Sequence, residues 1–304
     1  MNPYYKDYAE YLAEIFPGKK LQKLSVNTGG GCPNRDGTLG TGGCIYCNNR
    51  SFTPAYCFGV SGVRAQLEAG KRFFRRKYRD MEYLAYFQSF TSTYGSGLAA
   101  NLDEAMATEG IRGVVIGGRP DCLGDEVLDI LHRAGEMMPI FVEIGVETLH
   151  DATLARIHRG HDAATAVKAI ERTAAAGLHT GVHLIAGLPG EAREMMLETI
   201  DGICGLPVES IKMHHLQVLR GSQLHGMVES GEVEVAPWKL EEYLEFCCDV
   251  VARIPEHIAV ERFLAQAPPE MVVAPRWNIR NYEFVHRLHK ALFLKNCSRR
   301  GRRL

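Results

Sequence analysis

Short apolar runs rich in β-forming residues recur along the chain, with helical patterns between them. The six runs span residues 21–28, 83–90, 113–117, 140–147, 180–186 and 210–218. Strands that alternate with helices are typical of parallel βαβ units. The pattern therefore predicts an α/β protein built on a partial (β/α)6 barrel of the TIM type.

Two of the intervening helices have clear boundaries in the sequence. Asp162 is a good N-cap for an apolar run with helical spacing that stops at Gly177, and a second helix opens at residues 123–125 and ends near Met138, before Pro139. Such start and stop residues are typical of helices that pack on a sheet. They support the predicted barrel.

The pattern changes after about residue 221. A polar turn is followed by an amphipathic helix over 237–254, a short apolar run at 258–260 and a final helix over 281–294. We therefore predict three parts: an N-terminal extension (1–20), the barrel (21–220) and a small C-terminal α/β cap (221–304) that ends in an Arg-rich tail.

Chemically versatile residues follow the predicted strands. Cys32, Cys44 and Cys47 come after the first strand, Cys122 lies just beyond the third, and Glu147 ends the fourth. In a parallel barrel the active residues lie at the C-terminal ends of the strands and in the loops after them. The sequence therefore predicts one active rim.

Composition and charge limit the partners and the cellular compartment that we expect for this protein. The 304 residues carry a net charge of −1, so the chain as a whole does not attract nucleic acid or membrane. No apolar run reaches the length of a membrane span, and the first residues lack the pattern of a signal peptide. Nine cysteines, an odd number in a long chain, favour a reducing compartment over disulfides. We expect a cytoplasmic protein without a membrane contact.

The three cysteines of the first loop have the spacing C-x11-C-x2-C. A structural zinc site needs four protein ligands, whereas a 4Fe-4S cluster held by three thiolates keeps one iron open for another ligand. The loop offers no fourth Cys or His nearby, because Cys57 lies ten residues beyond Cys47. The pattern favours a cluster with an open iron.

This loop, with an aromatic residue between its last two cysteines, resembles the radical S-adenosylmethionine (SAM) superfamily. More narrowly it is similar to the YhcC/YtqA-type subgroup, which is related to the catalytic subunit of Elongator. The matching blocks after the cysteine loop occur in order at residues 118–122, 142–148, 159–162, 183–191, 211–214 and 274–277. The resemblance covers about residues 20 to 280.

The resemblance implies two cofactors, a 4Fe-4S cluster on Cys32, Cys44 and Cys47, and SAM bound to the open iron. An electron from a reducing partner such as flavodoxin or ferredoxin would cleave SAM and release a 5′-deoxyadenosyl radical. Tyr46 would pack near the adenine. The same resemblance implies that the strand-five block with His183 and Gly187 contacts the adenine through its backbone, although a lone His on a strand is more often a satisfied core residue.

Strand two departs from the superfamily's usual Gly-Gly-Glu end, which holds the SAM amino group. Gln88, Ser89 and Thr91 stand there instead, and their oxygens can still accept hydrogen bonds from an ammonium group. On strand four, Glu143 and Glu147 alternate onto one face. We expect Glu147 to bind the SAM ribose or amino group with Glu143 deeper; the alternative is structural pairing with Lys212 or Arg159.

Three residues are candidates for contact with the substrate. Lys212 and His214 alternate onto one face of strand six, and Cys122 is a spare thiol that can donate a hydrogen atom or pack without a function. Arg159 and His161 precede a helix, where they bind an anionic group or brace the rim.

The sequence leaves more than one class of substrate possible. A cationic segment at residues 71–79 and the tail at 299–303 offer phosphate contacts, although such a helix is more often a solvated face. The Elongator-like resemblance favours tRNA, with wobble-uridine chemistry. Radical chemistry on a small metabolite or peptide is the alternative, and a metal-binding regulatory protein is a third possibility.

Overall fold

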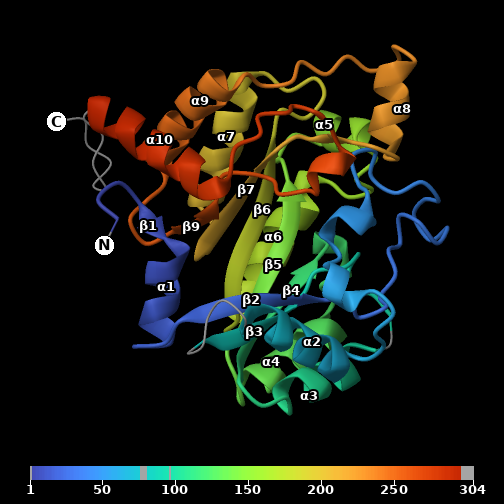
Figure 1. The fold of residues 1–304 in the computed structure, drawn as a ribbon. Helices are drawn as coiled ribbons and strands as arrows, with labels where there is room; N and C mark the ends of the chain where they lie inside the picture. The colour runs from blue at the N-terminus through green and yellow to red at the C-terminus, as the bar shows by residue number, and fades with distance from the viewer. Residues whose placement is uncertain (1, 76–80, 96, 296–304) are drawn as a thin grey trace.

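A curled sheet of eight parallel strands forms the centre of the computed structural model, which describes residues 2–75, 81–95 and 97–295 (Figure 1). The order across the sheet is β1-β9-β7-β6-β5-β4-β3-β2. Its strands are β1 (Lys6–Asp7), β2 (Leu21–Val26), β3 (Glu82–Phe87), β4 (Ile111–Gly118), β5 (Ile140–Glu147), β6 (His179–Ala186), β7 (Ser210–His215) and β9 (Ala259–Arg262). The sheet curls into a half-barrel, which confirms the predicted fold class.

Six of these strands correspond to the six predicted runs, with small changes at their ends. The second ends at Phe87 instead of residue 90, and the sixth ends at His215, after which β8 (Val218–Leu219) pairs antiparallel with β10 (Val272–Ala274) in a separate ribbon. The sequence did not predict that β9 and β1 extend the barrel sheet. They add to β7 in that order.

Helices cover the outer face of the sheet (Figure 1). Those on this face are α2 (Val63–Arg75), α3 (Leu98–Met106), α4 (Asp125–Gly135), α6 (Ala163–Ala175) and α7 (Arg193–Cys204). The short helices α5 (Asp151–Arg156) and α8 (Gln223–Glu229) instead contribute to a separate core cluster with Ile45 of the cysteine loop. Short 3-10 turns lie at Asn49–Phe52, Ala55–Cys57, Pro120–Cys122 and Pro269–Met271. The main core lies between these helices and the outward side chains of the strands, such as Leu24, Phe87 and Val142, which are fully buried.

The two long C-terminal helices pack on the same side as α7. These are α9 (Leu240–Arg253) and α10 (Asn281–Leu294), and α9 contacts both α7 and α10. Phe246 and Phe284 are fully buried there and belong to the main core. The C-terminal segment is thus joined to the barrel both by β9 and by a shared core.

The first helix, α1 (Tyr8–Ile15), packs at the end of the half-barrel where strands such as β5 and β6 begin. Asp7 caps it by accepting a hydrogen bond from the Glu10 backbone N–H at 2.9 Å. Tyr11 and Leu12 then pack against inward side chains of the sheet, including Phe141. The N-terminal residues therefore cover the end of the half-barrel opposite the C-terminal ends of the strands.

The cationic segment on α2 differs in one respect from the expectation. Lys71, predicted on the solvated face, is buried; its ammonium group donates to Glu68 at 2.6 Å and to the Glu109 carbonyl at 2.7 Å. Arg72 and Arg75 are exposed as predicted. Lys71 is satisfied by protein groups and is not available to phosphates.

Candidate active site

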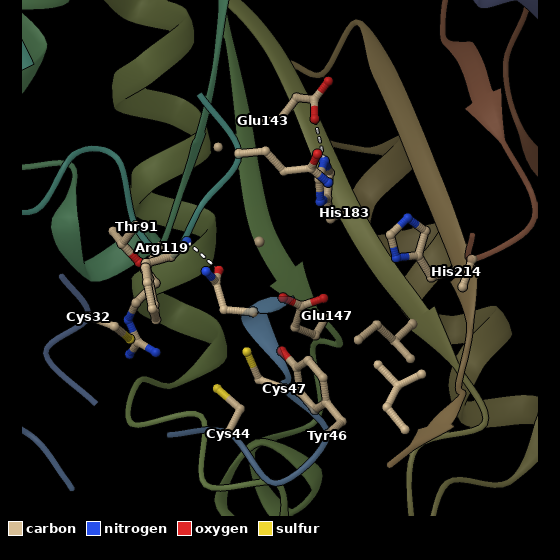
Figure 2. A pocket seen from close by; sticks show the side chains of 18 of the residues that line it. Cys32, Cys44, Tyr46, Cys47, Thr91, Arg119, Glu143, Glu147, His183 and His214 are labelled. Carbon is tan, nitrogen blue, oxygen red and sulfur yellow. Dashed lines mark hydrogen bonds and ion pairs between the residues drawn. The ribbon is translucent and has the colours of Figure 1, made fainter. Parts of the chain in front are cut away.

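One cavity opens at the C-terminal ends of the strands and has about 1200 Å³ of empty space, counting the part open to solvent. It brings together ten of the fourteen residues predicted for the site: Cys32, Cys44, Tyr46, Cys47, Gln88, Thr91, Glu143, Glu147, His183 and His214. Figure 2 shows the cysteines at one end of this cavity and Glu143 with His183 at the other. The structure therefore places these ten residues together at one cavity, and their roles in a site stay predictions.

The cysteine loop presents three free thiols to this cavity. Two polar side chains donate to the sulfur of Cys44, Arg159 through Nη1 at 3.4 Å and Asn34 through Nδ2 at 3.6 Å. Arg35 donates to the Cys47 carbonyl at 3.1 Å and so holds the loop from the other side. Hydrogen bonds to a ligating sulfur orient it and tune the metal centre that it binds.

The arrangement of the thiols bears on the choice between zinc and a cluster. Within residues 2–75, 81–95 and 97–295, no group of three or more His, Cys, Asp or Glu side chains is arranged to hold a single metal ion. In a 4Fe-4S cluster each thiolate binds a different iron, so the three sulfurs need not converge on one point. Three thiols at one cavity fit a 4Fe-4S cluster that keeps one iron open.

Glu147 ends β5 in a left-handed conformation, with φ of 68°. A register shift between β5 and β6 at this point turns the chain, and the carboxylate Oε1 lies 3.2 Å from Arg159 Nη2. The same guanidinium donates to the Gly145 carbonyl at 2.5 Å. A Cβ at Gly145 would lie 2.6 Å from Arg159 Nη2, so only glycine leaves room for this contact.

Arg159 therefore joins the cysteine loop to Glu147. Burial alone would lower the pKa of its guanidinium, but Tyr46, Cys44 and Glu147 hold that pKa well above its usual range. The group stays charged. The sequence had left Arg159 between an anion-binding and a bracing role, and the structure shows that it contacts the cysteine loop, the end of β5 and Glu147.

A second group of charged side chains surrounds Glu143, which lies four residues before Glu147 on β5. Its carboxylate accepts hydrogen bonds from Lys212 at 2.9 Å, from His183 at 2.6 Å and from the Tyr86 hydroxyl at 2.6 Å, and it also binds Lys23. Burial alone would raise the pKa of Glu143, but Lys212 and Lys23 hold it well below its usual range. The carboxylate is ionised and fully occupied by protein partners.

Glu261 on β9 completes this network. It lies 2.6 Å from Lys23 and 3.0 Å from Lys212, so two buried lysines face two carboxylates. Unpaired buried charges are costly, and this arrangement leaves neither lysine alone. Of the two roles weighed for Glu143, the geometry favours the structural one.

Three buried polar atoms of residues that line the cavity have no hydrogen-bond partner among the described residues. They are Nη1 of Arg119, Nε of Arg159 and Nε2 of His214. Burial lowers the pKa of His214 well below its usual range, so the ring is neutral at pH 7. Buried polar atoms are nearly always hydrogen-bonded, so these three are available to hydrogen-bond a ligand. Arg119 was in a matching sequence block but had no assigned role.

Four predicted site residues are not among the residues that line the cavity: Ser89, Cys122, Gly187 and Lys212. Ser89 is buried, and a Cβ on Gly187 would lie 2.4 Å from Trp238 Nε1. Burial raises the pKa of the Cys122 thiol to about 12, so it keeps its proton at neutral pH. Their assigned roles stay predictions.

Family models match most of the chain. The model described as the radical SAM superfamily matches residues 26–203, and the radical SAM C-terminal domain matches residues 208–293. The chain belongs to the radical SAM superfamily. It is accordingly an enzyme of the class that uses a 4Fe-4S cluster and SAM.

Curated relatives agree with this assignment. The chain is 32% identical over 284 residues to the uncharacterized protein YtqA of Bacillus subtilis, covering 93% of this chain and 87% of YtqA. It is 35% identical over 263 residues to protein YhcC of Escherichia coli K12, covering 86% and 83%. A tRNA uridine(34) acetyltransferase of Methanocaldococcus jannaschii is 26% identical over 204 residues, with 64% of this chain and 37% of that protein covered. The YhcC/YtqA-type resemblance is confirmed.

The fold has a solved counterpart in the Elp3 protein of Methanocaldococcus infernus. The TM-score is 0.66 at 16% sequence identity, and the match covers 92% of this chain and 64% of that one. At this identity the likeness shows the fold alone. Among the described residues, no helix is both long and apolar enough to cross a membrane.

Proposed function

We propose that this radical SAM enzyme modifies tRNA at the side chain of the wobble uridine. Cys32, Cys44 and Cys47 hold the cluster, and a flavodoxin or ferredoxin supplies the electron. When bound there, a reduced cluster would supply one electron to the sulfonium of SAM, whose C–S bond breaks to give methionine and the 5′-deoxyadenosyl radical. The observation that carries the site assignment is the single cavity shared by the three thiols and Glu147.

The chain's own residues then orient SAM. Arg159 fixes the Glu147 carboxylate through one oxygen, and Oε2 has no ion pair or hydrogen bond within the described part of the chain. That oxygen is free to accept from a ribose hydroxyl or the amino group of SAM. Tyr46 lines the same wall and offers a ring for the adenine.

Replacing Glu147 by Gln should weaken SAM binding by roughly tenfold or more, because a charge-assisted hydrogen bond is lost. Iron content should not change, since the carboxylate contacts no cysteine sulfur. Anaerobic calorimetry of SAM binding to the reconstituted protein measures the effect. Glu198→Gln, at a carboxylate on α7 whose side chain is 68% exposed, is the matched control. Equal SAM affinity in Glu147→Gln and wild type would make Glu147 a structural residue.

The tRNA part of the proposal rests on two supports. One relative bears the name tRNA uridine(34) acetyltransferase, although only 37% of it is covered, so acetyl transfer is not carried over. The other is the pair Arg72 and Arg75, which are exposed on α2 in a chain with almost no net charge. The remaining cations of that segment, at residues 76–79, and the tail at 299–303 lie outside the described residues.

If α2 contacts tRNA phosphates, affinity should fall steeply as salt rises, because each contact releases counterions at roughly 0.9 log units of affinity per decade of salt. The double variant Arg72→Gln/Arg75→Gln should weaken binding and lower that slope by up to about two units of log K per decade. Filter binding of total tRNA over a salt series measures both. The matched control is Arg133→Gln/Lys168→Gln, two exposed cations on α4 and α6. A slope that ignores Arg72 and Arg75, or no binding at low salt, would favour a small-molecule substrate.

A further inference from the structure

The half-barrel has an open side between its edge strands, and an ion pair crosses it. Strand β2 hydrogen-bonds only to β3 within the sheet, yet Lys23 on β2 lies 2.6 Å from Glu261 on β9. A second cavity lies at this seam, with about 1430 Å³ of empty space counting the part open to solvent. We call it the seam cavity. The residues that line it include Lys23, Glu261 and Arg262 and the aromatic side chains of Tyr56, Phe73 and Phe74.

A bulge on β9 directs two successive charged side chains to this cavity. Ile211 pairs with Val260, but the next residue of β7, Lys212, pairs with Arg262, which leaves Glu261 as an extra residue on β9. In a regular strand neighbours point to opposite faces, and a bulge changes the direction of a side chain. Glu261 and Arg262 accordingly both line the seam cavity.

Arg262 is the cation without a counter-charge in this group. Lys23 and Lys212 share the carboxylates of Glu143 and Glu261, whereas no carboxylate among the described residues forms an ion pair with Arg262. Its Nη1 has only a long contact of 3.4 Å to Gln266, and its buried Nε has no partner in the described part of the chain. The guanidinium therefore has donors available to an anion.

Aromatic rings form another part of the same cavity. Phe73 on α2 has 58% of its surface exposed, and its ring lies 5.8 Å from that of Tyr56 and 5.1 Å from that of Phe74. The Tyr56 hydroxyl donates to the Ser25 carbonyl at 2.9 Å, which fixes this ring against β2. An exposed phenylalanine beside fixed rings is a surface on which a base can stack.

The seam cavity and the active-site cavity share a wall. Tyr86, Gln88 and Gln266 line both of them. The two cavities are therefore neighbours, with these three side chains between them.

We propose that the seam cavity binds a nucleotide of the substrate, with Arg262 on its phosphate and Phe73 with Tyr56 against its base. This inference rests on the proposed function, because it makes the nucleotide part of a single-stranded tRNA loop. Arginine suits a phosphate because its planar guanidinium donates two parallel hydrogen bonds. Aromatic stacking accepts any base, so the uridine itself is selected deeper in the barrel.

The phosphate contact is tested with uridine 5′-monophosphate and uridine on cluster-loaded protein. Wild type should bind the monophosphate roughly tenfold or more tightly than uridine, the effect of one charge-assisted contact. R262Q should bind both equally, R262K should retain part of the preference, and the exposed-site control R133Q should match wild type. Thermal melting reports whether each variant is folded. No preference in wild type, or an undiminished preference in folded R262Q, would overturn the proposal.

Phe73→Ala tests the stacking contact. It should weaken uridine and uridine 5′-monophosphate alike, by roughly tenfold, because stacking does not involve the phosphate. The matched control is Phe293→Ala, which removes a ring that is 70% exposed on α10. Unchanged affinity for both ligands in Phe73→Ala would contradict the stacking role.

An anticodon stem-loop RNA separates this inference from the proposed function. If wild type binds the stem-loop and R262Q binds it equally, the seam proposal is wrong while the tRNA proposal stands. If wild type binds uridine 5′-monophosphate through Arg262 but does not bind the stem-loop, the seam binds nucleotides and the tRNA proposal is wrong.

Discussion

Alanine at any one of Cys32, Cys44 and Cys47 should abolish the iron–sulfur cluster. Anaerobically reconstituted wild type should be brown with about four irons per chain, and each variant should be nearly colourless, because two thiolates cannot hold the cube in this cavity. Reductive cleavage of SAM to 5′-deoxyadenosine should be lost with it. Iron analysis and the visible spectrum measure the first effect, and chromatography of the nucleoside measures the second.

Cys204 on α7 is the matched control for this series. Its thiol is half-buried and is not among the residues that line the active-site cavity, so Cys204→Ala should retain the full iron content. A wild type that takes up one zinc ion per chain and no iron would contradict the cluster assignment.

The second large effect is expected at Glu143. Replacing it by Gln leaves Lys23 and Lys212 with Glu261 as the one carboxylate that pairs with them in the described part of the chain. Removing one partner of a buried ion pair costs about 3–5 kcal/mol of folding free energy. For a domain of this size that corresponds to a fall in Tm of roughly 10 °C. Calorimetry at a fixed scan rate measures it.

A second substitution and a surface control make this test specific. Lys23→Met added to Glu143→Gln should recover part of the loss, because it removes an uncompensated buried charge. Glu245→Gln breaks the Lys295–Glu245 contact, in which both side chains are exposed (40% and 67%), and should cost less than about 1 kcal/mol. A Glu143→Gln protein as stable as Glu245→Gln would contradict the network's structural role.

The pH dependence of stability has a defined sign at Glu143. Its pKa is lower in the folded chain than in the unfolded chain, so the folded state releases the proton more readily. The stabilisation is fully present above the unfolded value of about 4.3 and is lost as pH falls toward the folded value. Glu143→Gln should flatten this acid limb.

Local sequence patterns were sufficient for much of the fold. The continuous apolar run of β5 and the periodic helix α10 have the predicted bounds, because each is set by neighbours along the chain. The position of β9 was not predictable in this way, since its partner β7 lies more than forty residues earlier. The role of α1 also depends on distant contacts, because Tyr11 and Leu12 pack on strands that follow much later.

The candidate site likewise contains some residues that local sequence signals reveal and others that depend on distant contacts. The cysteines and Glu147 were found from spacing and from position at strand ends. Lys23 and Arg262 were missed, because a single charged residue on a strand carries no sign of the distant residues that it will meet. Arg159 had been considered, but its contact with Cys44 depends on a loop more than a hundred residues earlier.

The central claim is that the radical chemistry of this chain is directed at a tRNA uridine. It is tested most directly by comparing the modified nucleosides of total tRNA from cells with and without the gene. The account predicts that one modified uridine disappears without the gene, returns with the wild-type gene, and does not return with the Cys47→Ala variant. Identical nucleoside profiles with and without the gene, under conditions in which the protein is made, would contradict it.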